Sequence, residues 1–162
     1  MKCLIISDSH GNTSYMSRAL TMHPDAEVVF FLGDGLSDAD SLAVYYNDKA
    51  WIAVRGNCDF SGFFRNSPAL KTEEITLMGK RIVLTHGDIY DVKYGLDRLK
   101  YLALEASADI VLFGHTHRPH EEFVSGEHSF YLFNPGSISS PSYSFGILTL
   151  TEDTVLFSHG TL

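Results

Sequence analysis

Short apolar runs recur along the chain, and five of them are followed closely by a residue that can bind a metal. The runs cover residues 4–6, 28–32, 52–54, 82–84 and 110–113. Their length and their content of Val, Ile, Leu and Phe are typical of buried strands. In an open α/β sheet, ligands gather at the carboxyl ends of the strands. The pattern therefore predicts that the side chains after these runs meet at one edge of a sheet.

The segments between the first three runs space their apolar residues as helices do. Residues 13–22 predict a helix capped by Thr13, and residues 37–47 predict a second helix that begins at Ser37 or Asp38. An alternation of strand and helix predicts parallel strands joined by right-handed crossovers.

The second half of the chain has a different rhythm. Residues 73–77 and 80–85 flank a Met-Gly turn and predict a β-hairpin, and residues 92–106 form the longest helical segment. We expect an α/β fold in which two packed mixed β-sheets form a β-sandwich flanked by α-helices, in a single domain over residues 1–162. Four later segments predict antiparallel strands: residues 121–124, 129–133, 145–151 and 155–158.

Composition narrows the classes of function. The hydrophobic fraction of 44% and the charged fraction of 20% are ordinary for a globular protein. Twelve Lys and Arg against twenty Asp and Glu give a net charge of −8, which opposes binding to nucleic acid or to anionic lipid. We therefore expect neither a nucleic-acid nor a membrane partner. A small anionic substrate can still bind where metal ions invert the local field.

The remaining bulk features suggest a cytoplasmic protein. The two cysteines, Cys3 and Cys58, imply no disulfide framework, and Cys3 is expected to be a small buried hydrophobe. The first residues run directly into a strand and do not resemble a signal peptide. No apolar stretch approaches the roughly 18 residues that a bilayer-spanning segment needs.

The first two strand ends carry candidate metal ligands. Asp8 and His10 stand two residues apart, so both side chains can point to the same side, and this pair suits Zn, Mn, Fe or Ni. The alternative is a loop in which Asp8 caps the following helix. Asp34 follows Gly33, either in a simple turn or as a carboxylate whose two oxygens bridge two metals.

The other three strand ends add an amide and three imidazoles. Asn57 follows Gly56, and its amide oxygen can bind a metal without adding negative charge, although a turn is the alternative. A lone histidine such as His86 is more often structural. Residues 114–117 place two histidines on one turn, which indicates metal binding. Seven ligands exceed the four of a tetrahedral zinc site and suit two ions about 3.5–4 Å apart. The candidate ligands are Asp8, His10, Asp34, Asn57, His86, His115 and His117.

This ordered set of motifs resembles the calcineurin-like metallophosphoesterase family. Residues 134–137, Asn-Pro-Gly-Ser, resemble a motif of its small single-domain bacterial and archaeal phosphodiesterase branch. The resemblance extends from residue 4 to at least residue 150 and implies a two-sheet sandwich flanked by helices. It also implies two metal sites that share Asp34: one of Asp8, His10, Asp34 and His117, and one of Asp34, Asn57, His86 and His115.

The activity implied by the resemblance is metal-dependent hydrolysis of a small phosphodiester. Two divalent ions would polarise the phosphoryl oxygens, and a hydroxide that bridges them would attack phosphorus. Asp34, Asn57 and His86 would form the catalytic set. Manganese is the expected ion, with nickel, iron, zinc and magnesium as alternatives. Arg55 and Arg118 would bind phosphate or would otherwise be solvated surface charges.

One position departs from many larger relatives of this family. They carry a histidine directly after the motif asparagine, where it protonates the leaving group, whereas this chain has Cys58. A thiol with a pKa of about 8.5 is a weak donor. Small phosphodiesterase relatives often share the cysteine, so activity is compatible with it. We expect substrates with good leaving groups to be favoured.

Two other functions remain as alternatives. The retromer subunit with this fold works mainly through protein contacts and has altered metal-site residues, whereas all seven positions are intact here. A nuclease of the family usually adds capping or DNA-binding regions, and this chain shows neither an obvious cap nor a basic face.

Phe60, Phe63 and Phe64 are expected in the core, with a substrate wall or a homo-oligomer contact as alternatives. The remaining histidines, His23, His120, His128 and His159, are expected to be structural, with a role in the site as the alternative for His120.

Overall fold

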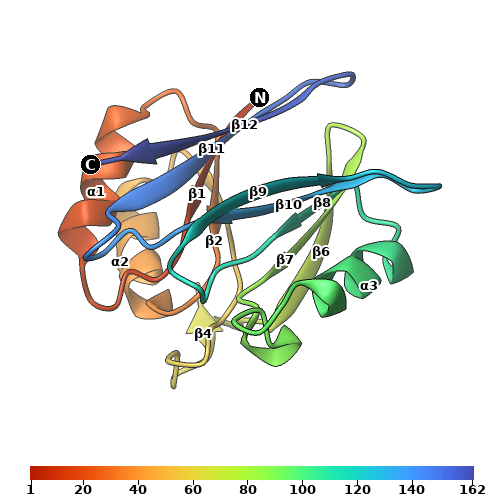
Figure 1. The fold of residues 1–162 in the computed structure, drawn as a ribbon. Helices are drawn as coiled ribbons and strands as arrows, with labels where there is room; N and C mark the ends of the chain where they lie inside the picture. The colour runs from red at the N-terminus through yellow and green to blue at the C-terminus, as the bar shows by residue number, and fades with distance from the viewer.

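A computed structural model describes all residues from 1 to 162 and shows two five-stranded sheets packed face to face between helices (Figure 1). The first sheet has the strand order β12-β11-β1-β2-β3, and the second has the order β6-β7-β8-β10-β9. Helices α1 and α2 cover the outer face of the first sheet, and α3 covers the outer face of the second. The expected α/β sandwich of two mixed sheets flanked by helices is confirmed.

The first sheet combines the N-terminal half of the chain with a C-terminal hairpin. Strands β1, β2 and β3 are parallel, and β11 pairs antiparallel with both β1 and β12. The helices α1 and α2 make the crossovers between the parallel strands, as the alternation predicts. The elements are β1 Lys2–Ile6, α1 Thr13–Met22, β2 Val28–Phe31, α2 Leu36–Tyr45, β3 Ala50–Ala53, β11 Ser144–Leu150 and β12 Val155–Thr161.

The second sheet begins with the predicted hairpin. Strands β7, β8 and β10 are parallel, and β6 and β9 flank them antiparallel. A short two-stranded hairpin, β4 Phe63–Phe64 and β5 Ser67–Pro68, precedes it. The other elements are β6 Thr72–Leu77, β7 Lys80–Thr85, the 3₁₀ turn η1 Asp88–Tyr90, α3 Asp97–Glu105, β8 Ile110–Leu112, β9 Pro119–Val124 and β10 Phe130–Pro135.

Alternation along β1 divides the core into layers. Leu4 and Ile6 join the cluster beneath α1 and α2, whereas Cys3 and Ile5 join the cluster between the two sheets. Successive side chains of a strand point to opposite faces, so a strand covered on both faces is apolar at every position. Cys3 is fully buried, as expected, and the central strands fix the positions of the loops that follow them.

The structure differs from the sequence-based expectation at the third helix. α3 begins at Asp97 instead of residue 92, because the preceding segment is held in turns. Val92 is buried and lies so close to Gly87 that a Cβ there would lie 2.9 Å from its Cγ2. Gly95, at φ 159°, interrupts any helix across this segment. α3 is consequently shorter than α1 and α2.

Three smaller expectations were also wrong. α2 begins at Leu36 and ends at Tyr45, and Thr13 is the first residue of α1 without a capping hydrogen bond from its side chain. Of the three phenylalanines expected in the core, only Phe64 is buried, while Phe60 and Phe63 are 97% and 56% exposed.

None of the helices combines the length and the apolar character that a membrane crossing requires.

The contact between the two sheets is tight at Gly146, which gives a stability test. Gly146 pairs with Ile5, and a Cβ at this position would overlap the ring of Phe133 from the second sheet. We expect Gly146→Ala to lower the free energy of unfolding in urea by about 1–3 kcal/mol, because a packed core does not accept an extra methyl group. Gly126→Ala is the control, since its nearest contact would be an ordinary 3.7 Å. Equal stability of the two variants would contradict this packing.

Candidate metal centre

Loops from both sheets converge on one site at the carboxyl ends of their parallel strands. The loops after β1, β2 and β3 carry the candidate ligands of the first sheet, and those after β7 and β8 carry the histidines of the second. The side chains meet, as expected. They do so at the seam between two sheets, however, and not along the edge of one sheet as the strand pattern suggested. The fold thus supplies ligands from two directions.

The first ligand group consists of Asp8, His10 and His117. The Nε2 atoms of His10 and His117 are 3.3 Å apart, and Asp8 Oδ1 lies 3.1 Å from His117 Nε2 and 3.9 Å from His10 Nε2. Asp8 Oδ2 accepts hydrogen bonds from Ser7 Oγ at 2.6 Å and from the His115 N–H at 3.2 Å. Asp8 Oδ1, in contrast, is buried without a hydrogen-bond partner. A buried carboxylate oxygen in this state is costly unless a cation neutralises it.

The second group consists of Asp34, His86 and His115. His86 is fully buried, and its Nδ1–H donates to the Leu32 carbonyl at 2.7 Å. Its Nε2 lies 3.4 Å from Asp34 Oδ2 and 3.1 Å from His115 Nδ1. A carbonyl that accepts from one ring nitrogen orients the imidazole and leaves the other nitrogen for a metal. His86, which the sequence left open as a structural histidine, therefore faces the ligand groups.

The two groups are adjacent, and Asp34 of the second group lies near His10 of the first. One of its carboxylate oxygens also lies within 4.8 Å of candidate ligand atoms of His10 and Cys58, and Asp8 Oδ1 is 3.9 Å from His86 Nε2. Asn57 is different. It is exposed, and its amide Nδ2 donates to Cys58 Sγ at 3.2 Å. The structure thus brings six of the seven candidate ligands into two interlocking groups, with Asn57 beside them.

The electrostatics of the site favour positive charge at its centre. Burial works against ionisation of Asp34, but the hydrogen bond and positive charge of His86 outweigh it and hold the pKa of Asp34 well below its usual range. Burial likewise favours neutral His86, but Asp34 and Asp8 together raise its pKa. The close approach of Asp8 raises the pKa of His117. The carboxylates of Asp8 and Asp34 thus favour positive charge between the two ligand groups.

Five of the ligand residues hold backbone conformations that residues other than glycine adopt only rarely. The angle φ is 57° at Asp8, 47° at His10, 57° at Asp34, 66° at His115 and 59° at His117. Such conformations persist only where the surrounding structure enforces them, and they concentrate at functional sites. This clustering is independent evidence that the strand-end loops are shaped for their side chains.

Asp59 supports the site, and sequence reasoning missed it. Its carboxylate accepts hydrogen bonds from four backbone N–H groups at 2.7 to 2.9 Å, those of Asp34, Gly35, Leu36 and Gly56. It therefore fixes the loop of Asp34 against the loop of Asn57. No local signal marked it, because α2, whose first N–H groups need acceptors, begins 23 residues before Asp59 in the sequence.

Two further polar residues hold the ligand loops. Asp38 Oδ2 accepts from Ser9 Oγ at 2.6 Å and from the Gly11 N–H at 2.8 Å, so α2 holds the loop that carries His10. Asn134 Nδ2 donates to the Gly114 carbonyl at 2.8 Å, so the Asn-Pro-Gly-Ser motif supports the turn of His115 and His117. From the sequence, Asp38 was predicted only as a possible start of the second helix, and Asn134 only as part of a family motif.

The two predicted phosphate-binding arginines lie in different settings. Arg118 is exposed directly after His117 and lines a cavity beside it. The Arg55 guanidinium lies against Gly62, where a Cβ would be 2.9 Å from its Nη1, and its Nε is buried without a hydrogen-bond partner. Only Arg118 is therefore seen to border both the ligand groups and a cavity.

Cys58 occupies the position beside Asn57. Its N–H donates to Asp34 Oδ1 at 2.8 Å, and its Sγ is near His10 and Asp34. Burial and the negative charge of Asp34 raise the pKa of the Cys58 thiol. The thiol thus stays neutral near pH 7 and is a weaker acid than in solution.

Comparison with known proteins identifies the family. The sequence profile of the calcineurin-like phosphoesterase superfamily domain matches residues 1–160. The probable metallophosphoesterase YsnB of Bacillus subtilis strain 168 is 35% identical over 157 residues, which cover 94% of this chain and 86% of YsnB. The phosphodiesterase YfcE of Escherichia coli K12 is 31% identical over 170 residues, which cover 91% of this chain and 87% of YfcE.

A solved structure shares the fold at lower sequence identity. Vps29 from Entamoeba histolytica, in complex with Zn²⁺, has a TM-score of 0.71 at 22% identity and covers 99% of this chain and 98% of its own. In sequence, the chain is similar to the family profile and to the two bacterial relatives. The chain therefore belongs to the calcineurin-like phosphoesterase superfamily, a family of hydrolases.

Proposed function

We propose that the chain is a phosphodiesterase that binds two divalent metal ions and hydrolyses a small phosphodiester. The observation that carries this proposal is the position of Asp34, which lies beside His10 on one side and beside His86 and His115 on the other. Two ligand groups that share a carboxylate suit two ions a few ångströms apart. The similarity to YfcE, which is named a phosphodiesterase, supports the reaction class.

The donor set fits divalent transition metals. Imidazole and carboxylate together suit manganese, iron, zinc or nickel better than an ion that takes oxygen ligands only, and we propose manganese. Asp8, His10 and His117 with Asp34 would hold one ion, and Asp34, Asn57, His86 and His115 the other. When bound, the ions supply Lewis acidity for the phosphoryl oxygens and make hydroxide available near neutral pH. The unpartnered Asp8 Oδ1 supports this assignment.

The residues of the chain would have separate roles in this reaction. Leu32 keeps the proton of His86 on Nδ1, so that Nε2 faces the site. Asp59 holds the backbone of Asp34 and thereby positions a ligand without contacting the substrate. Arg118 would orient the phosphate of the substrate, and we retain Arg55 as a second candidate for this role. The hydrogen bonds of Leu32 and Asp59 would hold His86 and Asp34 in position before substrate arrives, so these two ligands would need little reorganisation.

A scaffold function is the alternative, because Vps29 has the same fold. All seven candidate metal ligands are present here, which favours catalysis.

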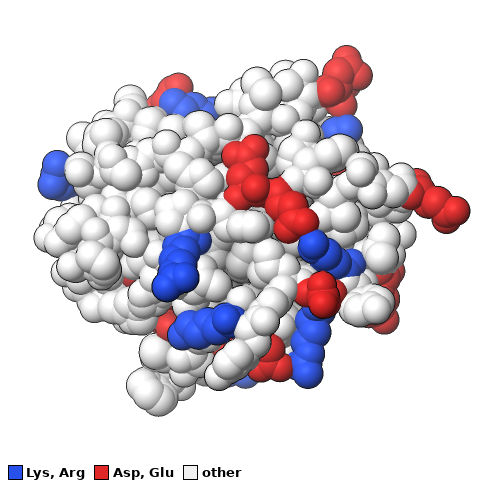
Figure 2. Space-filling model, viewed as in Figure 1, with Lys and Arg blue, Asp and Glu red and all other residues white.

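A nuclease function is disfavoured by the surface charge of the protein. On the face in Figure 2, acidic side chains form a band over β9, and no continuous basic surface is present for a polyanion. A nucleic acid bound through its phosphates needs such a surface.

Substitution of either of two proposed metal ligands, Asp34 or His86, should nearly abolish activity. We expect Asp34→Asn and His86→Ala to reduce hydrolysis of bis-p-nitrophenyl phosphate with Mn²⁺, Ni²⁺ or Mg²⁺ by about 100-fold or more, because each variant removes a metal ligand. The exposed Asp153→Asn is the control and should retain activity. Wild-type protein that shows no metal-dependent turnover, or turnover unchanged in both ligand variants, would refute the phosphodiesterase proposal.

The weak acid at Cys58 predicts a steep dependence on the leaving group. A series of aryl diesters with phenols of increasing pKa should show rates that fall steadily, because no strong donor protonates the departing oxygen. An alkyl monoester should react far more slowly than bis-p-nitrophenyl phosphate. A flat series would show that another group donates this proton.

Asp59 should control metal affinity through Asp34. We expect Asp59→Ala to raise the Kd for Mn²⁺ by about 10-fold to 100-fold, because removing the support of a metal ligand has an effect of this size. Titration calorimetry on the folded variant measures the change, and Asp153→Ala serves as the matched control. Unchanged Mn²⁺ affinity together with reduced stability would show that Asp59 is purely structural.

A further inference from the structure

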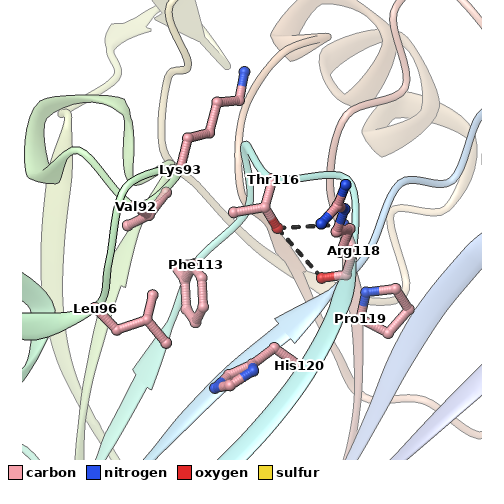
Figure 3. A pocket seen from close by; sticks show the side chains of 8 residues that line it. All are labelled: Val92, Lys93, Leu96, Phe113, Thr116, Arg118, Pro119 and His120. Carbon is pink, nitrogen blue, oxygen red and sulfur yellow. Dashed lines mark hydrogen bonds between the residues drawn. The ribbon is translucent and has the colours of Figure 1, made fainter.

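A cavity of about 570 Å³ lies beside the metal centre, between the segment that precedes α3 and the loop that joins β8 to β9 (Figure 3). Thr116 and Arg118, which flank the candidate ligand His117, line one wall. Residues of the segment 92–96 line the wall opposite. The cavity therefore adjoins the loop that carries His117.

The cavity carries positive charge that the protein does not neutralise. Its charged side chains are Lys93 and Arg118, and no Asp or Glu lines it, although the chain as a whole has a net charge of −8. Neither side chain makes a hydrogen bond or an ion pair, and Arg118 contacts Thr116 Oγ1 only through its backbone. Lys71, in contrast, is paired with Asp88 at 2.8 Å. The cavity thus offers two unpaired cations.

The rest of the lining combines apolar residues with the polar Thr116 and His120. Phe113 and Val92 are 1% and 5% exposed, so they are fixed parts of the core. At the other end, the ring of His120 lies 6.0 Å from that of Phe113, and its Nε2 is 3.4 Å from Glu122. An aromatic ring bound in the cavity would bury its apolar face against these apolar side chains, which would favour binding. The apolar lining consists of Val92, Leu96, Phe113 and Pro119.

We propose that this cavity binds the ester group of the diester that stays on phosphorus, and that Lys93 and Arg118 select a group in which a ring carries a carboxylate or a second phosphate. The ring would lie against the accessible apolar side chains of Leu96 and Pro119, and the anionic substituent would accept charge-assisted hydrogen bonds from the two cations. This inference rests on the proposed phosphodiesterase function. The metal centre would bind the phosphate group, which all diesters share, whereas the cavity would contact the ester group, in which they differ.

A matched set of substrates tests the proposal. Each is a diester with p-nitrophenol as leaving group and a second phenyl group that is unsubstituted, carries a carboxylate, or carries a trimethylammonium group. With Mn²⁺-loaded full-length protein, we expect kcat/KM for the carboxylate to exceed that for the trimethylammonium compound by about tenfold, as one charge-assisted hydrogen bond would produce.

Substitution of Lys93 should change this selectivity without removing activity on the neutral diester. We expect Lys93→Met to lower kcat/KM for the carboxylate diester by about tenfold and to leave the phenyl diester within about twofold. Lys93→Glu should reverse the preference. Lys80→Met, at the far end of β7, is the control. Calorimetric binding of 4-carboxyphenyl phosphate and phenyl phosphate gives a readout that does not depend on turnover.

The outcomes separate this proposal from the one on which it rests. If wild-type protein hydrolyses none of the diesters, the phosphodiesterase function fails and this inference fails with it. If wild type hydrolyses all of them and the Lys93 variants keep the same selectivity and the same product binding, the cavity proposal is overturned while the phosphodiesterase function stands. A reversed preference in Lys93→Glu supports it.

Discussion

A fully buried carboxylate at the seam between two sheets is the constraint on which the site depends. Asp8 stands at the end of β1 in the first sheet, and its Oδ2 accepts from the N–H of His115 in the second. Its own carbonyl accepts from Ser137 Oγ at 2.9 Å. Burial of an ionised carboxylate costs several kcal/mol unless it is paired. Oδ1 has no hydrogen-bond partner and faces the Nε2 atoms of His10, His86 and His117, so a cation among these groups would offset the cost of burying the carboxylate.

Close approach of the loops is the second requirement, and two glycines satisfy it. A Cβ on Gly56 would overlap Asp34 Oδ1, and a Cβ on Gly114 would overlap Ser7 Oγ. With no side chain at these positions, backbones from different strands lie against the carboxylates. The ligands are then held by backbone conformation and hydrogen bonds more than by the packing of their own side chains. A rigid first contact shell of this kind is what a metal site needs to keep its geometry.

The sequence predicts those parts of the structure that depend on residues close together in the chain. Helix α1 has the predicted bounds because its apolar spacing is regular. The ligand positions were visible because each follows an apolar run. The division of the strands between two sheets was not visible in the ligand pattern, since pairing joins distant residues, such as Ile5 with Gly146. Lys93 was missed for the same reason: it stands in a segment that looks helical, and its neighbours come from the loop after β8.

Local charge explains how an acidic chain can act on an anion. Asp8 and Asp34 repel a phosphodiester, but two divalent ions would more than offset two carboxylates and make the loaded centre positive. Lys93 and Arg118 extend that positive region into the adjacent cavity. Phosphate affinity in the proposed reaction then depends on metal occupancy, and linkage makes the dependence reciprocal. A bound diester would hold the metals more tightly, so substrate would stabilise the form of the enzyme that hydrolyses it.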